Sequence, residues 1–231
     1  MTNEDSFKQQ AAERALEYVQ NGMRLGLGTG STAIFLLRGL AERLHDGRLR
    51  DVAGVPTSEM TANLARELGI PLVTLAECPQ LDLALDGADE INPYLDLIKG
   101  LGAALLREKI VAASAARFFV IGSESKCVAE LGEHTHLPVE VVQFAIPLCA
   151  RRLAALGSRP MLRMTAEGTP LRTDEGHVIL DCRFAGIPEA AALNEAIMMI
   201  PGVVGHGLFV GMAERAIVAG PGGVREIFLE S

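Results

Sequence analysis

The chain has 231 residues and a formal net charge of −8, with 49% hydrophobic and 22% charged residues. This composition is typical of a globular protein and excludes a predominantly disordered one. The negative charge repels phosphodiester backbones and anionic lipid, so we expect no nucleic-acid partner and no membrane partner. An anionic small molecule would need a locally positive pocket.

The cysteines and the apolar segments indicate the compartment. Cys78, Cys127, Cys149 and Cys182 are far apart and show no paired spacing. Nothing near the N-terminus resembles a signal peptide, and no apolar run reaches the ~18 residues that a bilayer span requires. We therefore expect reduced thiols and a cytoplasmic location.

The first part of the chain alternates between helical and strand patterns. Helices are predicted over residues 7–20, 32–44, 59–68 and 105–113, and strands over 23–28, 52–58, 71–75, 81–89 and 117–122. This alternation predicts an α/β fold with a mainly parallel sheet covered by helices. In such sheets ligands bind at the carboxyl ends of the strands, where the candidate motifs fall.

The pattern changes after about residue 132. Strands are predicted over 137–142, 161–165 and 177–184, with a turn at 173–176 and helices over 148–156 and 189–199. This arrangement predicts a second, smaller α+β lobe over about 133–207. Two later strands, 207–211 and 216–220, are expected to return to the first lobe, so residues 1–132 plus about 208–231 would form a discontinuous main domain.

The sequence GLGTGST at residues 26–32 joins a predicted strand to a predicted helix. Its glycines allow close approach of the backbone, its three hydroxyl side chains supply donors, and the helix directs unpaired N–H groups there. A phosphate would fit. Ser31 occupies the third glycine position of a dinucleotide fingerprint, and a Walker loop would need Gly-Lys-Ser/Thr. The alternative is a plain strand-to-helix turn capped by Ser or Thr.

The segment LALDGADEI ends another predicted strand. Alternation places Asp86 at the end of the strand, and Gly87 turns the chain so that Asp89 is expected to return near it. Two neighbouring carboxylates can divide acid and base roles, because each raises the cost of ionising the other. The alternatives are an Asp-rich turn that caps a helix and, with Glu90, a site for a hard metal ion.

The segment KGLGAALLREK combines a lysine, two glycines and an apolar helix. Lys99 ends a short strand beside Gly100 and Gly102, where an ammonium group and free N–H groups would favour negative charge. The helix carries Glu108, whose neighbours three and four residues away are apolar, so poor solvation would favour proton transfer by this carboxylate. An internal ion pair with a neighbouring basic residue is the alternative.

Four further residues are weaker candidates. Lys126 follows a strand in GSESK and could join an anion pocket, whereas Lys8 is expected to be solvated on a helix face. His134 and His136 could face one way on a strand and bind a metal, but no third ligand is near in the sequence. No Ser-His-Asp or Cys-His arrangement is visible.

Five motifs in order, GLGTGST, VPTS, LDGADEI, KGLGAALLREK and GSESK, closely resemble the A-type ribose-5-phosphate isomerases. The resemblance continues through LPVEVV, VILDC, IPGVVGHGLF and AGPGGV and covers essentially the whole chain. It implies a Rossmann-like main domain, a ferredoxin-like smaller lobe, a homodimer or homotetramer, and no metal or organic cofactor. In one departure, Leu101 separates Gly100 from Gly102, where the family often has consecutive glycines.

The resemblance implies interconversion of D-ribose 5-phosphate and D-ribulose 5-phosphate through an enediolate, a step of the pentose phosphate pathway. Glu108 would be the base, Lys99 would stabilise the oxyanion, and Asp86 and Asp89 would assist ring opening and orient hydroxyls, in roles that could be exchanged. The implied substrate-binding residues are Thr29, Gly30, Ser31, Thr32, Asp86, Gly87, Ala88, Asp89, Lys99, Gly100, Leu101, Gly102 and Lys126.

Two other functions stay open at this point. A related sugar-phosphate deaminase or a coenzyme A transferase could use a similar scaffold, because a fold alone does not determine the chemistry. A sugar-phosphate sensor could keep the pocket without turnover. Such regulators usually carry a DNA-binding segment, and the sequence shows no basic helix-turn-helix.

Overall fold

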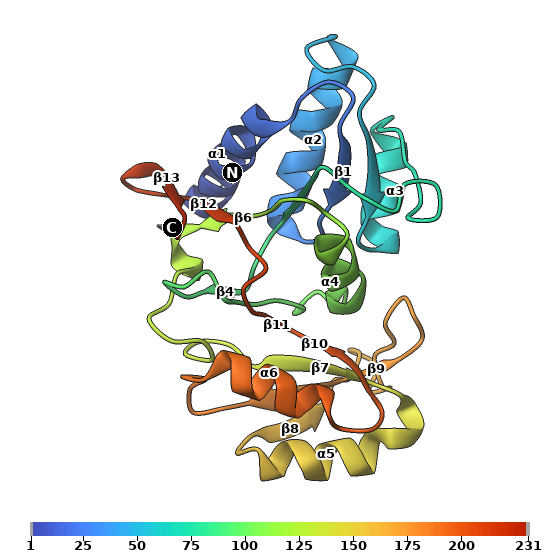
Figure 1. Ribbon diagram of the computed structural model, residues 1–231, viewed down its shortest axis with the longest axis vertical. Coiled ribbons are helices and arrows are strands. Elements are labelled where there is room, and N and C mark those ends of the chain that lie inside the picture. Colours follow the sequence, from blue (N-terminus) through green and yellow to red (C-terminus); the bar gives the residue numbers. More distant parts are fainter. Residues whose placement is uncertain (1, 230–231) are drawn as a thin grey trace. The chain divides into compact units, whose positions relative to one another are not determined.

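The computed structural model describes residues 2–229, which form two compact units (Figure 1). The first unit comprises residues 2–88, 107–126 and 211–229, and the second comprises 89–106 and 127–210. No helix within residues 2–229 combines the length and apolar character needed to span a membrane.

The first unit is built on a mainly parallel sheet. Its strands among the described residues are β1 (Arg24–Leu27), β2 (Ala53–Pro56), β3 (Leu83–Asp86), β6 (Phe118–Ser123), β12 (Arg215–Gly220) and β13 (Gly223–Ile227). The strand order is β13-β12-β6-β3-β1-β2, and every neighbouring pair is parallel except β12 and β13. The expected α/β class is therefore confirmed, and the carboxyl ends of β1, β2, β3 and β6 lie along one edge of the sheet.

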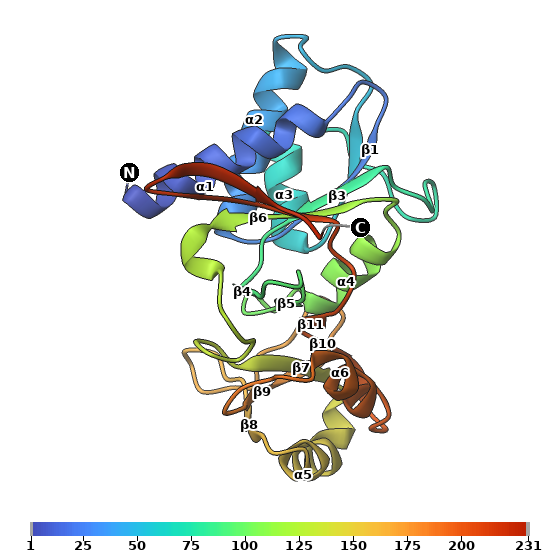
Figure 2. The ribbon, with the colours of Figure 1, turned by 60° about the vertical axis from the view of Figure 1, so that its left-hand side comes forward.

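Helices cover this sheet and supply its core. They are α1 (Asn3–Ala15), η1 (Leu16–Tyr18), α2 (Ser31–His45), α3 (Glu59–Glu67), α4 (Leu105–Ala113), which begins in the second unit, and the short η2 (Glu124–Lys126). The helices α1 and α2 lie side by side (Figure 1), and the β12–β13 hairpin packs against α1 (Figure 2). Leu36, Leu37 and Leu40 recur at helical spacing and are buried in the core against Leu25 and Leu27.

The second unit contains a four-stranded antiparallel sheet. Its elements in chain order are β7 (Leu137–Val141), η3 (Gln143–Ala145), α5 (Ile146–Ala155), β8 (Arg159–Leu162), β9 (Val178–Arg183), α6 (Ala190–Met198) and β10 (Val203–His206). The strand order is β10-β7-β9-β8. A β-α-β-β-α-β sequence with this order is the ferredoxin-like arrangement that the resemblance implied.

The two faces of this sheet differ in character. Alternate residues of β9, Val178, Leu180 and Cys182, join a core that includes Cys149 of α5 and Ile197 of α6, so both helices cover one face. The opposite face therefore carries Ile179 and Asp181 of β9 and Glu140 of β7. On that face Asp181 contacts Arg163, and Glu140 contacts Thr173 and His177.

A small sheet changes the expected division of the chain. Its strands are β4 (Glu90–Ile91), β5 (Leu97–Ile98) and β11 (Leu208–Phe209), in the order β11-β5-β4. We expected residues 207–211 to return to the first lobe, but β11 pairs with β5 and Leu208 is buried in the core of the second unit. Residues 89–106 contain β4 and β5 of this small sheet and also belong to the second unit, although we had assigned them to the main domain.

One further strand prediction is wrong, and one strand was not predicted. Residues 71–75 form no strand, and only an isolated bridge joins Leu72 to Gly54 of β2. The strand β12, predicted at 216–220, is confirmed, but the hairpin partner β13 was not anticipated. Its residues are exposed or half-buried, so it lacks the continuous apolar pattern of the central strands.

Replacing Leu36 tests the core of the first unit. Leu36 is fully buried, so Leu36→Ala should lower the free energy of unfolding by about 2–5 kcal/mol through lost burial and a residual cavity. Urea denaturation measures this change. Met60→Ala is the control, because the exposed Met60 should change stability by less than about 0.5 kcal/mol. Equal losses for the two variants would contradict the assignment of the core.

Candidate active site

The first feature of the site is the Asp86 carboxylate at the carboxyl end of β3. Asp86 is buried, and its Oδ1 accepts hydrogen bonds from the backbone N–H of Thr29, at 3.0 Å, and of Gly87, at 2.7 Å. The end of β1 approaches closely, since a Cβ on Gly28 would lie 2.2 Å from Asp86 Oδ1 and 2.6 Å from Asp86 Cα. Only glycine leaves room for this contact.

Hydroxyl groups that follow β1 and β2, with one from α3, form a buried network beside this carboxylate. The Oγ1 of Thr29 lies 2.7 Å from Thr57 Oγ1, 2.8 Å from Ser58 Oγ and 3.0 Å from Thr61 Oγ1. Thr61 in turn donates to the Gly28 carbonyl. Sequence reasoning had assigned no role to Thr57, Ser58 or Thr61. The sequence feature that could have indicated these hydroxyls is the VPTS motif, which lies at the end of β2, the neighbour of β1.

The N-terminus of α2 meets the requirements of an anion site better than those of a capped turn. Its N-cap is Gly30 at φ 109°, and no side chain caps the helix. The alternative of a Ser or Thr cap is therefore wrong for this turn. Ser31 is exposed, Thr32 is buried, and the first-turn N–H groups retain their affinity for negative charge.

Glu108, on α4, borders the same small interior space as Asp86. The helix has the predicted bounds, and Glu108 is buried on it. One pocket of the first unit is lined by Asp86, Glu108, Gly28, Thr57 and the apolar Val111, among others. The two carboxylates are separated in the sequence. Asp86 lies at the end of β3, which pairs with β1, and Glu108 lies on α4, which borders the same space.

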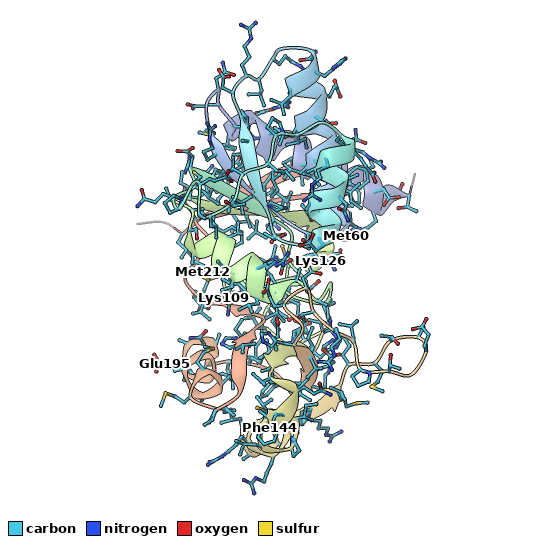
Figure 3. All side chains as sticks on the ribbon, turned by 90° about the vertical axis from the view of Figure 1, so that its right-hand side faces the viewer. Met60, Lys109, Lys126, Phe144, Glu195 and Met212 are labelled. Carbon is cyan, nitrogen blue, oxygen red and sulfur yellow. The ribbon has the colours of Figure 1, made fainter. Side chains whose placement is uncertain are left out.

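The basic residues of the first unit lie in different surroundings. Arg107 donates to Glu59 at 2.9 Å, and burial lowers the pKa of Lys109 to about 8. Lys126 is half-buried at the carboxyl end of β6, and Figure 3 shows it on the same side of the first unit as Met60 in α3.

Lys8 was expected to be solvated, and this expectation is wrong. Its side chain is only 15% exposed and lies 4.0 Å from Glu4 Oε1. Glu4 accepts hydrogen bonds from Ser123 and Ser125, which end β6 and follow it. Lys8 is therefore, after Lys126, a second lysine associated with the carboxyl end of β6. The sequence does not show this, because it depends on the packing of α1 against β6.

The second unit carries the other predicted site residues, Asp89 and 99–102. The backbone N–H of Asp89 donates to the Ile98 carbonyl, and its Oδ2 accepts from the Leu101 N–H at 3.0 Å. Lys99 is buried, its N–H donates to the Gly207 carbonyl at 2.9 Å, and its Nζ lies 5.4 Å from the centre of the Phe209 ring. These contacts fix the start of the glycine loop.

The glycine loop accommodates Leu101 without strain. Gly100 has φ 100°, and a Cβ there would lie 2.7 Å from Leu105 Cβ, so glycine is required at this position. Leu101 has no positive φ, and its side chain is 40% exposed. The departure from consecutive glycines therefore falls on a loop position whose backbone and exposure accommodate a side chain.

Glu90 and the two histidines have structural contacts. The Glu90 carboxylate accepts from the backbone N–H groups of Gly132, His134 and Thr135, so it anchors that loop. His136 Nε2 lies 3.1 Å from Asp181 Oδ1, and His134 is exposed. Within residues 2–229 no group of three or more His, Cys, Asp or Glu side chains could hold a metal ion.

Buried carboxylates and hydroxyls at the strand ends of a parallel sheet, beside an uncapped helix N-terminus, are typical of α/β enzymes that carry out acid–base chemistry. The family model described as ribose 5-phosphate isomerase A (phosphoriboisomerase A) matches residues 53–223. The chain belongs to the ribose 5-phosphate isomerase A family.

Individual relatives agree with this assignment. The ribose-5-phosphate isomerase A of Roseiflexus castenholzii is 66% identical over 221 residues, covering 96% of this chain and 94% of the relative. That of Synechococcus sp. (strain JA-3-3Ab) is 54% identical over 98% of this chain and 99% of the relative.

Solved structures agree as well. A D-ribose-5-phosphate isomerase in complex with phospho-erythronic acid has a TM-score of 0.97 at 37% identity, covering 99% of this chain and 100% of that chain. The enzyme from Methanocaldococcus jannaschii has a TM-score of 0.93 at 39% identity, covering 97% of this chain and 99% of that chain.

Replacing Gly28 tests the close approach of β1 to Asp86. The added methyl group in Gly28→Ala must displace the Asp86 backbone as well as its carboxylate, so we expect a loss of about 1–3 kcal/mol in the free energy of unfolding. Gly222→Ala is the matched control, because a Cβ at Gly222 meets nothing within 4 Å. A Gly28→Ala protein as stable as Gly222→Ala would contradict the described geometry.

The lowered pKa of Lys109 predicts a pH dependence of stability. The folded protein releases this proton near pH 8 and the unfolded chain near 10.5, so the unfolded state binds more protons between these values and stability rises with pH there. The difference of 2.5 units corresponds to about 3 kcal/mol. Lys109→Met should remove this rise, measured as the difference in urea midpoint between the two proteins from pH 7 to 10. Parallel pH profiles would contradict it.

Proposed function

We propose that this protein interconverts D-ribose 5-phosphate and D-ribulose 5-phosphate, as an intramolecular isomerase of the pentose phosphate pathway. Membership of the family supports the substrate and the reaction class. The observation that carries the chemistry is that the buried carboxylates of Asp86 and Glu108 border the same small interior space of the first unit, about 140 Å³ in volume. A deaminase, a transferase or a sensor would not be expected to match one isomerase family over nearly the whole chain.

In the proposed mechanism Asp86 assists opening of the sugar ring by proton transfer. Glu108 then removes the proton from C2 of the open aldose and delivers it to C1, so that the intermediate is an enediolate. A buried carboxylate suits both steps, because a carboxylate can accept a proton and return it, and burial limits its contact with bulk water. Asp89 would orient substrate hydroxyls, and its role could be exchanged with that of Asp86.

The developing oxyanion would be stabilised by Lys99 and by N–H groups of the loop at residues 99–102. Preorganised donors of this kind contribute most where charge forms in the transition state. The buried Lys99 ammonium and the fixed backbone of Gly100 support this assignment. The turn at residues 29–32, with its uncapped helix, would hold the substrate, and Lys126 would help to bind its phosphate.

Three further properties belong to the proposal. The reaction as written needs only proton transfers between side chains and substrate, so we propose that it uses no metal or organic cofactor. We also propose a homodimer or homotetramer, as the resemblance to the family implies, and a cytoplasmic location, which the unpaired spacing of the cysteines supports.

Ketose formation from ribose 5-phosphate, with EDTA present, tests the proposed function. Glu108→Gln should lower kcat by about 10²- to 10⁴-fold, because the amide cannot accept the C2 proton, and Asp86→Asn should impair ring opening. Glu42→Gln is the matched control, since its side chain is 73% exposed, and it should retain full activity.

Three outcomes would contradict the proposal. Full activity of Glu108→Gln would remove the base assignment, and loss of wild-type turnover on chelation would remove the cofactor-free mechanism. Binding of ribose 5-phosphate by the wild type without turnover would favour the sensor. Inorganic phosphate should compete with the substrate if an anion site is present.

A further inference from the structure

Arg163 contacts the glycine loop from within the second unit. It follows β8, its backbone N–H donates to the Ile179 carbonyl of β9 at 2.9 Å, and its side chain is only 11% exposed. Its Nη1 donates to two successive carbonyls of the loop, that of Gly100 at 3.1 Å and that of Leu101 at 3.0 Å. The sequence analysis had given this residue no role.

The other side of the guanidinium is held by the polar face of the sheet. Arg163 Nε donates to Asp181 Oδ2 at 2.9 Å, and Nη2 donates to Asp181 Oδ1. His136 Nε2 lies 3.1 Å from the same Oδ1 and 3.5 Å from Arg163 Nη2. Because a guanidinium is planar and its donors are fixed, Asp181 determines where Nη1 points.

The carbonyls that Arg163 holds determine the directions of the N–H groups that follow them. In a planar trans peptide unit the carbonyl and the N–H point in opposite directions. In the peptide unit between Gly100 and Leu101, the carbonyl accepts from Arg163 and the N–H donates to Asp89. In the peptide unit between Leu101 and Gly102, the carbonyl accepts from Arg163, so the Gly102 N–H is directed away from the guanidinium. Among the described residues no group accepts that N–H.

We propose that Arg163, oriented by Asp181, is a positioning residue that fixes the peptide units of the glycine loop so that the Gly102 N–H is available to the developing oxyanion. This inference rests on the proposed function, which assigns the N–H groups of the loop to that charge. Lysine could not replace Arg163, because one ammonium cannot hold two carbonyls and a bidentate carboxylate in fixed directions.

Steady-state kinetics of Arg163→Lys test the role. Since misplacing a reacting contact by about 1 Å costs roughly 10²-fold, we expect kcat to fall by about 10- to 100-fold while KM changes little. In Arg163→Ala, guanidinium chloride at sub-denaturing concentration should restore part of kcat. Arg172→Ala is the matched control, because Arg172 donates to the Gly176 carbonyl and to Gln143, away from the glycine loop. It should keep wild-type kcat.

The readouts separate this inference from the proposed function. If the wild type turns over ribose 5-phosphate but Arg163→Lys keeps its kcat, or if guanidinium restores nothing to Arg163→Ala, the positioning role is overturned. Amide hydrogen exchange requires no activity, and exchange at Leu101, whose N–H donates to Asp89, should be faster in Arg163→Lys and unchanged in Arg172→Ala. Unchanged exchange in Arg163→Lys would overturn the inference even if the wild type proved inactive.

Discussion

The close approach of Gly28 to the Asp86 carboxylate is the constraint on which the rest of the first unit's site depends. Parallel pairing of β1 with β3 brings the two strand ends together, and the missing Cβ lets the Thr29 N–H reach Asp86 Oδ1. That bond fixes the turn from which α2 begins, and the Thr29 hydroxyl then joins the network at the end of β2. One backbone contact therefore couples a carboxylate, a helix N-terminus and a cluster of hydroxyls, and a side chain at position 28 would disturb all three.

The glycine loop of the second unit is organised in a comparable way, through carbonyls and N–H groups held from outside the loop. The Gly207 carbonyl accepts from the Lys99 N–H, Asp89 accepts from the Leu101 N–H, and Arg163 donates to the carbonyls of Gly100 and Leu101. Gly207 itself has to be glycine, because a Cβ would lie 2.1 Å from the Lys99 carbonyl oxygen. A loop whose polar groups are directed by fixed partners loses little entropy when a ligand binds, which is the condition for preorganised electrostatic stabilisation.

The parts of this structure that local pattern controls could be predicted from the sequence. Helical spacing gave the bounds of α4, and strand alternation placed Asp86 at the end of β3. The remaining features depend on which strands become neighbours. The VPTS motif marks Thr57 but does not show that its hydroxyl meets that of Thr29, and Arg163 belongs to none of the motifs. The two-residue strands β4, β5 and β11 are too short to show a periodic pattern, so the sequence does not reveal that residues 89–106 belong to the second unit.

The net charge of −8 explains why binding of an anionic substrate has to rely on local groups. At physiological ionic strength the Debye length is about 8 Å, so the acidic surface acts only weakly beyond that distance. Donors close to the bound anion therefore decide its affinity. The proposed donors are fixed or largely buried: the uncapped first turn of α2, the Lys99 ammonium and the half-buried Lys126. Burial deprives an ammonium group of hydration, and for this reason the pKa of Lys109 is lowered. A bound phosphate or enediolate offsets this loss only where it contacts the ammonium group directly. An acidic chain of this kind therefore favours anions that fit its donors and excludes those that would bind through net charge alone.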